Sequence, residues 1–134
     1  MSNAPKTFMK LIVADEEAMA DYYRAVYGLK DVLRVQGESA GSKERFREVI
    51  LSADGKMGGT FVLFNFVDRP KPRDQQSIAG WVVDDIEATR DRILANGGKL
   101  VGEIMEKPEH GVRVLFSEDP EGALSEIVQL AVPA

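Results

Sequence analysis

Side chains able to transfer protons or bind charged groups are few in this sequence. His110 is the single histidine, and an imidazole can exchange a proton near neutral pH. Its place beside Gly111 predicts a loop, where it would lie at the rim of a pocket or simply face solvent. Arg45, Arg47 and Arg113 fall in segments that alternate like strands, so an inward-pointing arginine could bind an acidic or phosphorylated ligand through two hydrogen bonds. The alternative is that these arginines face solvent or pair with glutamates.

Aromatic residues and one glycine of the predicted strands could contact a flat ligand. Trp81 could stack on such a ligand, as could Phe61, Phe64, Phe66 and Phe116. Because strand residues alternate between two faces, most of these aromatic side chains are expected in the core. Gly80 lies inside a predicted strand, which is typical either of a ligand that approaches the backbone closely or of a bulge.

Several kinds of chemistry are excluded or disfavoured. The sequence has no cysteine, which excludes disulfide bonds, thiolate catalysis and cysteine-type zinc sites. The glycine pairs at 58–59 and 97–98 do not belong to a phosphate-binding loop, and no Gly-x-Ser-x-Gly motif is present. A net charge of −5 offers no basic surface to nucleic acid. Residues 1–6 lack an apolar signal segment and no run approaches the roughly 20 apolar residues of a membrane span, so we expect a cytoplasmic protein without a membrane or nucleic-acid partner.

The hydrophobic pattern of the first half predicts a strand, a helix and three more strands. Residues 7–14 form a branched apolar run typical of a buried strand. Asp15 is expected to cap a helix, whose apolar face recurs at helical spacing until Gly28 ends it. The other strands of this half are predicted at residues 31–36, 45–53 and 59–66, and a charged connector is predicted at residues 68–76.

The second half repeats this order. Its helix is predicted to start at Asp84 or Asp85 and to end at residues 96–98, with its core face made by Ile86, Ile93 and Leu94. Its strands are predicted at residues 77–83, 99–104, 112–116 and 124–130. Asp15 and Asp84, Gly28 and Gly97, and Lys30 and Lys99 share one constant offset of 69 positions, which indicates an internal duplication.

These elements define the expected fold class. We predict an α+β fold in which two tandem βαβββ modules form a curved eight-stranded mixed sheet around a pocket, with the helices on the outer face. The whole chain, residues 1–134, would be a single domain, with module one at about 7–67 and module two at about 77–131.

Three stretches carry a resemblance to a known superfamily. They are Asp21-Tyr22-Tyr23 with Val26-Tyr27-Gly28-Leu29, Val83-Asp84-Asp85-Ile86-Glu87-Ala88 running to Asn96-Gly97-Gly98, and Asp119-Pro120-Glu121-Gly122-Ala123-Leu124-Ser125-Glu126. In their order and spacing, across about residues 7–131, the chain resembles the vicinal oxygen chelate superfamily of glyoxalases, bleomycin-resistance proteins and dioxygenases. The resemblance implies a small-molecule ligand in the pocket and a homodimer.

Metal-dependent members of that superfamily hold a divalent ion with four side chains, typically His or Glu, from the first and last strands of each half. By position, the first-strand ligands fall on Phe8 and Ile78, and the last strand of the first half offers only residues 61–64, which are apolar. Only Glu126 matches a ligand in type and position. Because one carboxylate cannot fix a divalent ion in an open site, we expect no metal and no other cofactor, and glyoxalase-type isomerisation and extradiol ring cleavage lose support.

Glu126, placed by the resemblance, is the candidate catalytic residue. In an apolar pocket it could act as a general base or accept a hydrogen bond from a ligand. The alternative is a structural remnant that pairs with Arg47 or Arg113. The full set of predicted ligand-binding residues is Phe8, Arg47, Leu63, Ile78, Gly80, Trp81, His110, Arg113 and Glu126.

The leading hypothesis for function is a metal-independent small-molecule-binding protein that sequesters a drug or metabolite, as resistance-type members do in a groove shared by two subunits. The acidic net charge suits cationic drugs. One alternative is a lyase or isomerase that uses Glu126 as its base or as a ligand of an unrecognised metal. Another is a structural or regulatory module attached to a partner.

Overall fold

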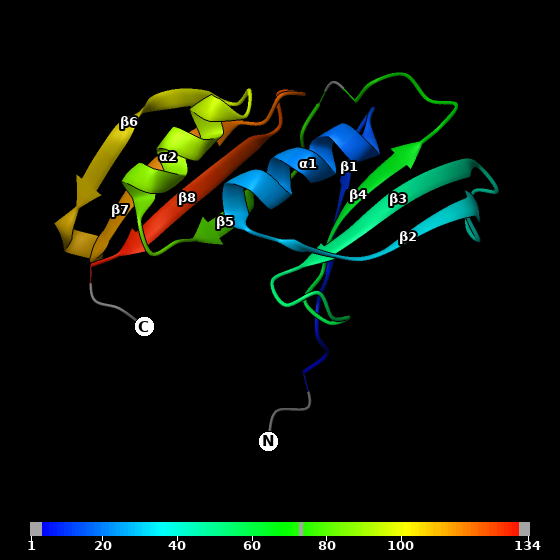
Figure 1. Cartoon of the computed structure of the whole chain (residues 1–134), viewed down its shortest axis with the longest axis horizontal. Helices are drawn as coiled ribbons and strands as arrows, with labels where there is room; N and C mark the ends of the chain where they lie inside the picture. Colours follow the sequence, from blue (N-terminus) through cyan, green and yellow to red (C-terminus); the bar gives the residue numbers. More distant parts are fainter. Residues whose placement is uncertain (1–3, 73, 132–134) are drawn as a thin grey trace. The chain divides into compact units, whose positions relative to one another are not determined.

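The computed structural model of the chain describes residues 4–72 and 74–131. Within them, two α-helices and eight strands follow the order β1-α1-β2-β3-β4-β5-α2-β6-β7-β8 (Figure 1). This order is a βαβββ unit that occurs twice, so the predicted α+β class and tandem modules are confirmed. No helix of the described residues is long and apolar enough to cross a membrane.

The first module contains five elements and one mixed sheet. They are β1 (Met9–Ile12), α1 (Glu16–Tyr27), β2 (Lys30–Glu38), β3 (Arg45–Ser52) and β4 (Phe61–Phe66). The strand order in the sheet is β1-β4-β3-β2. Strand β1 runs parallel to β4, and the other pairs are antiparallel.

The second module repeats this arrangement. Its elements are β5 (Ala79–Val82), α2 (Ile86–Ala95), β6 (Lys99–Lys107), the short 3-10 turn η1 (Pro108–His110), β7 (Val112–Glu118) and β8 (Leu124–Leu130). The strand order is β5-β8-β7-β6, again with the edge strand β5 parallel to its neighbour. The eight strands thus hydrogen-bond as two four-stranded sheets. The chain divides into two compact units after Pro72, and the expected pocket around which the sheets would curve stays a prediction.

Helix α1 begins and ends at the residues that its sequence signals predict. The Asp15 side chain accepts a hydrogen bond from the backbone N–H of Ala18 at 3.0 Å, which satisfies one of the free N–H groups at the helix start. Gly28 ends the helix with φ 72°, a left-handed conformation that costs glycine little. The core face includes Tyr23 and Val26, both fully buried.

Helix α2 agrees with expectation at its start and differs from it in one detail of its core face. Of the two predicted caps, Asp84 and Asp85, it is Asp85 that caps the helix, by accepting from the backbone N–H of Ala88 at 3.0 Å. The predicted inward position of Leu94 is wrong, because this side chain is 54% exposed while its neighbour Ile93 is fully buried. Consecutive helix residues point about 100° apart, so the helix buries Ile93 and Thr89 and leaves Leu94 outside.

All eight predicted strands exist, but glycines change two of their ends. Strand β4 starts at Phe61 rather than at residue 59, because Gly58 and Gly59 have positive φ angles of 104° and 62°. Strand β6 continues beyond residue 104 to Lys107, past Gly102 with φ 81°, where the pairing with β7 shifts register. This irregularity interrupts the alternation of side chains that a strand prediction depends on.

Pleating divides each sheet into two faces, which we call the helix-covered face and the helix-free face. In the first module, Phe61 packs against Tyr23 of α1 with ring centroids 4.8 Å apart, so it marks the helix-covered face. In the second module, Gln129 marks that face, because its side-chain oxygen accepts a hydrogen bond from the first backbone N–H of α2. Residues one position away, such as Val62 and Val128, therefore lie on the helix-free faces.

Candidate functional site

The helix-free face of the first module carries a charged pair among aromatic rings. Lys10 of β1 donates a hydrogen bond from Nζ to Oε1 of Glu48 in β3 at 2.8 Å. The Glu48 side chain is only 6% exposed, whereas that of Lys10 is 38% exposed. The Lys10 ammonium also lies 4.7 Å from the ring centroid of Phe64, a cation–π contact. Phe64 is the cross-strand neighbour of Glu48, so the three side chains form one cluster.

The helix-free face of the second module carries the carboxylate of Glu126. Its neighbours on the two adjacent strands are Gly80 of β5 and Phe116 of β7. A side chain added at Gly80 would meet no atom within 4 Å, so the surface next to Glu126 is open on that side. Within the described part of the chain, no side chain or backbone group bonds to the Glu126 carboxylate. The alternative in which Glu126 pairs with Arg47 or Arg113 is therefore wrong for this structure.

Four of the predicted ligand-binding residues lie on the helix-covered faces. Leu63 is fully buried there, two residues along β4 from Phe61. Trp81 is the cross-strand neighbour of the fully buried Ile127, and its indole N–H donates to the Ser125 hydroxyl at 3.3 Å. Because Gly80 and Trp81 are consecutive in a strand, they point to opposite faces. The other two residues are Arg47 and Arg113.

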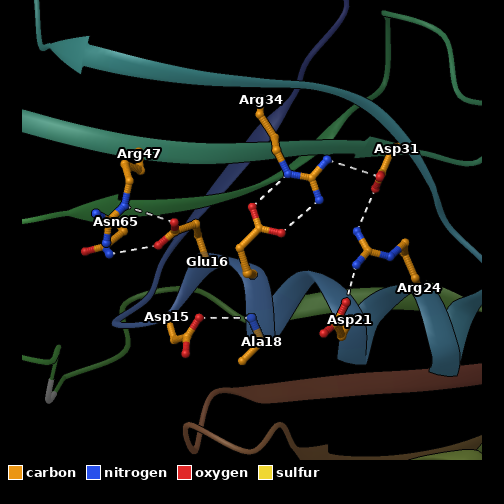
Figure 2. Close-up of polar contacts among 10 residues, drawn as sticks. Asp15, Glu16, Ala18, Asp21, Arg24, Asp31, Arg34, Arg47 and Asn65 are labelled. Atoms are coloured by element: carbon orange, nitrogen blue, oxygen red, sulfur yellow. Dashed lines mark hydrogen bonds and ion pairs between the residues drawn. The ribbon is translucent and has the colours of Figure 1, made fainter.

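Both arginines are engaged by glutamates at the start of the helix in their own module. Arg47 donates to Glu16 at 3.0 Å, and the amide nitrogen of Asn65 donates to the other oxygen of Glu16 at 2.9 Å (Figure 2). Arg113 binds Glu87 through two hydrogen bonds, of 2.7 and 3.0 Å, and donates a third to Glu106 at 2.8 Å.

These contacts change the titration of the second module's ion pair. The hydrogen bonds from Arg113 hold the pKa of the Glu87 carboxyl below its ordinary value. The carboxylates of Glu87 and Glu106 raise the pKa of the Arg113 guanidinium in turn. The sequence left open that the strand arginines pair with glutamates. The structure shows this for Arg113 in the second module and for Arg47 in the first.

A cavity of about 340 Å³ lies between the start of α1 and strands β2 and β3. The charged residues lining it are Glu16, Glu17, Arg34, Arg47 and Glu48. Arg34 donates hydrogen bonds of 2.7 and 2.8 Å to the Glu17 carboxylate, and these bonds lower the pKa of the Glu17 carboxyl. Since each arginine of the lining is already paired with a carboxylate (Figure 2), the cavity offers no uncompensated cation to an anionic ligand.

The ion pairs continue along the outside of α1 beyond this cavity. Arg34 also contacts Asp31 at 3.2 Å, and Arg24 joins Asp31 at 2.6 Å and Asp21 within the helix (Figure 2). Burial works to raise the pKa of Asp31, but the hydrogen bonds from Arg24 and Arg34 outweigh it, and the net direction is downward. These ion pairs between side chains of alternating charge connect α1 to β2.

The remaining predicted residues lie at exposed positions. Phe8 and Ile78 immediately precede β1 and β5, and their side chains are 62% and 54% exposed. His110 ends the 3-10 turn η1 and is also exposed. Arg45 binds Asp68 at the surface through two hydrogen bonds. Of the predicted set, Gly80 and Glu126 are the two that the structure brings side by side on a helix-free face.

The helix-free faces do not provide the donors that a divalent ion requires. In the first module the Glu48 carboxylate already accepts a hydrogen bond from the Lys10 ammonium. In the second module Glu126 has Gly80 and Phe116 as neighbours. Across residues 4–72 and 74–131, no three His, Asp or Glu side chains gather in a way that could hold a metal. The donor set present therefore does not fit the divalent ion of metal-dependent superfamily members.

Lys10 and Glu48 were not found from the sequence. They lie 38 positions apart, and neither belongs to a motif. One signal was present for Lys10, because this residue interrupts the otherwise apolar strand run at 7–14. A charged residue at such a position needs a partner if it is buried.

The chain belongs to the Glyoxalase/Bleomycin resistance protein/Dioxygenase superfamily. A profile of that superfamily matches residues 7–127, which covers both modules and confirms the resemblance. A comparison with curated protein sequences found no match.

Solved structures share the fold of this chain at low sequence identity. A glyoxalase family protein from Bacillus cereus is 18% identical, with a TM-score of 0.77 over 98% of this chain and 99% of that one. TioX from Micromonospora sp. ML1 is 20% identical, with a TM-score of 0.65 over 95% and 99%. A glyoxalase I mutant from Zea mays is 19% identical, with a TM-score of 0.69, and the match covers 91% of this chain but 44% of that one.

Proposed function

We propose that this protein is a metal-independent small-molecule-binding protein of its superfamily, and that Glu126 anchors a donor group of the ligand. The observation that carries the proposal is the Glu126 carboxylate, which has no bonding partner among the described residues and lies beside Gly80 on the helix-free face. The ligand class is an apolar molecule with an amine or another N–H or O–H donor.

The surroundings of Glu126 support this ligand class. A half-buried carboxylate without a partner loses part of its hydration, and a donor from a ligand would compensate that loss. Apolar side chains flank the open position at Gly80, since Val82, on the same face of β5, is 72% exposed and Ile78, immediately before the strand, is 54% exposed. Exposed apolar surface of this kind is typical of a binding surface. The net charge of −5 attracts cationic ligands over a distance.

The same arrangement argues for binding rather than metal-assisted catalysis. A divalent ion on the helix-free face of the first module would meet the Lys10 ammonium, and in neither module do three described His, Asp or Glu side chains gather to hold such an ion. Catalytic metal sites usually supply three protein ligands and keep one position open for substrate. We therefore assign no metal and no other cofactor to the proposed function.

The proposal is tested with a probe that has an apolar body and an ammonium group, 2-naphthylmethylamine. Its affinity for the full chain is measured by isothermal titration calorimetry against that of neutral 2-methylnaphthalene. We expect the amine to bind more tightly to the native protein, and Glu126→Gln to remove most of this preference. A charge-assisted hydrogen bond predicts a change of about tenfold in affinity.

Glu103→Gln provides the matched control. Glu103 is an exposed carboxylate on β6 of the same module, so its replacement changes the net charge equally without touching Glu126. The preference for the amine should survive in this variant. An equal loss in both variants would mean that the amine responds only to overall charge, and an unchanged preference in Glu126→Gln would refute the proposed anchor.

A further inference from the structure

The Lys10–Glu48 pair presents its positive end to the helix-free face of the first module. Glu48 is nearly buried at 6% exposure, while the Lys10 side chain above it is 38% exposed. A buried carboxylate beneath a part-exposed ammonium forms a dipole whose cationic end is the one that a ligand can reach. The ammonium has three donors, and one of them is used by Glu48. The cationic end therefore keeps donors for an incoming acceptor.

An aromatic surface extends from this ammonium. Phe64, beneath Lys10, stacks on Phe46 with ring centroids 5.0 Å apart and an interplanar angle of 12°. Phe66 meets Phe64 edge-on at 4.7 Å. Both Phe46 and Phe66 are half-buried, so part of each ring is accessible. At the far side of this surface the Arg69 guanidinium lies 3.8 Å from the Phe66 ring centroid.

We propose that Lys10 and this aromatic surface form an anion subsite, which binds a carboxylate or similar oxyanion attached to a flat apolar group. The oxyanion would accept hydrogen bonds from the Lys10 ammonium, and the flat group would pack on the exposed parts of Phe46 and Phe66. The inference rests on the proposed function, since it extends small-molecule binding to a second surface of the protein. It is made for the first module alone.

Charge complementarity selects this occupant over a cation. A divalent ion or an amine at this place would meet the Lys10 ammonium, and like charges repel strongly where water is partly excluded. Arg69 adds positive potential, although its guanidinium is held by Glu44 through hydrogen bonds of 2.6 and 2.5 Å. Lys10 is consequently the group whose removal should matter most.

A purely structural role for Lys10 predicts a different effect of its removal on ligand binding. If the lysine served only to neutralise Glu48, its removal would lower stability but would leave ligand preferences unchanged. The decisive readout is therefore a ratio of two affinities, measured in variants that remain folded.

The probes are naphthalene-2-carboxylate and naphthalene-2-carboxamide, which share a shape and differ in charge. Isothermal titration calorimetry with the full chain gives the affinity of each. We expect the native protein to prefer the carboxylate by about tenfold, as one charge-assisted hydrogen bond would give. Lys10→Met should bring the ratio close to one, and Lys10→Arg should retain most of it.

Two further variants keep the test decisive. Lys10→Met leaves Glu48 buried without its partner and could fail to fold, so the double variant Lys10→Met with Glu48→Gln removes both charges together. It should fold and should also lose the preference for the carboxylate. Lys30→Met, on β2 of the same module, removes an exposed lysine elsewhere and should keep the native ratio.

Failure of this inference can be distinguished from failure of the proposed function. A native protein with no preference for the carboxylate, or a preference that survives in the folded double variant, overturns the anion subsite. The amine probe and Glu126→Gln would still report on the anchor of the second module. Conversely, a carboxylate preference that depends on Lys10 supports the subsite even if Glu126→Gln leaves amine binding unchanged.

Discussion

Individual residues show which features the two modules share and which they do not. Arg47 and Arg113 occupy helix-covered faces and fasten their strands to the first turn of the helix through Glu16 and Glu87. The helix-free faces differ, because the first module carries the Lys10–Glu48 pair and the second carries the Glu126 carboxylate, which pairs with no described residue. Structural roles have thus been kept in both modules, and the residues available to a ligand differ.

The buried serines of the second module give a prediction at this scale. Ser117 and Ser125 are cross-strand neighbours, 1% and 4% exposed. Ser125 accepts the Trp81 indole N–H, while the Ser117 hydroxyl has no hydrogen-bond partner in the described part of the chain. Removing an unsatisfied buried hydroxyl costs nothing in lost bonds, so Ser117→Ala should leave the free energy of unfolding unchanged or raise it slightly.

Ser125→Ala is the matched comparison, since it removes the acceptor of the Trp81 indole. We expect it to lower the free energy of unfolding by about 1 kcal/mol. Urea denaturation followed by circular dichroism measures both variants. A larger loss for Ser117→Ala than for Ser125→Ala would contradict the assignment of these hydroxyls.

At the scale of elements, the helix caps distinguish two adjacent aspartates. Asp85 caps α2 through the backbone N–H of Ala88, whereas Asp84 is exposed and bonds to no described side chain or helix N–H. Loss of an N-cap carboxylate typically costs about 1 kcal/mol. Asp85→Ala should therefore lower the free energy of unfolding by about that amount, and Asp84→Ala should change it by less than about half as much. Equal effects in urea denaturation would show that the cap is assigned to the wrong residue.

The ion pair between β7 and α2 predicts a pH dependence of stability. Arg113 lowers the pKa of Glu87 in the folded protein below its unfolded value of 4.5. A group whose pKa is lowered by folding stabilises the folded state above its unfolded pKa, and that contribution is lost as the pH falls through the folded pKa. The free energy of unfolding should therefore decrease on acidification below about pH 4.5.

Arg113→Met should make this decrease shallower, because Glu87 then titrates at a similar pH in both states. Lys99→Met, which removes an exposed positive charge at the start of β6, serves as the control. Urea denaturation at a series of pH values between about 3 and 6 measures all three proteins. A steeper loss of stability in Arg113→Met than in the native protein would contradict the assigned direction of the Glu87 pKa.

The element order was predictable because each signal is local. Asp15 and Gly28 define a helix within a few residues of sequence, and their structural roles are as predicted. Which of Asp84 and Asp85 caps α2 was not determined by the sequence, because both precede the same apolar pattern. The burial of Ile93 beside the exposed Leu94 depends on how α2 rotates against its sheet, which no local signal specifies.

The candidate site was less predictable because it depends on which face each strand residue occupies. Gly80 and Glu126 share a helix-free face, but Trp81 and Leu63 lie on helix-covered faces. A shift of one residue in strand phase exchanges the two faces completely. The Lys10–Glu48 pair joins strands 38 positions apart, so only the register of β1, β4 and β3 reveals it.

At the scale of the whole molecule, the two copies of the βαβββ unit share their framework and differ in the charged residues of their helix-free faces. Both copies keep the strand order of the sheet, the capped helix and the arginine that fastens it. Among the residues that the structure describes, neither helix-free face has a set of metal ligands, and each has its own charged group. This pattern is consistent with ligand recognition by side chains, with opposite charge preferences on the two modules.

The most direct test is the metal content of the full chain, purified without chelator and measured by inductively coupled plasma mass spectrometry. Binding of 2-naphthylmethylamine is then compared before and after dialysis against EDTA. We predict nickel, zinc, manganese and iron each well below one ion per chain, and an affinity that EDTA leaves unchanged. One tightly held ion per chain, with amine binding that disappears when the ion is removed, would contradict metal-independent binding.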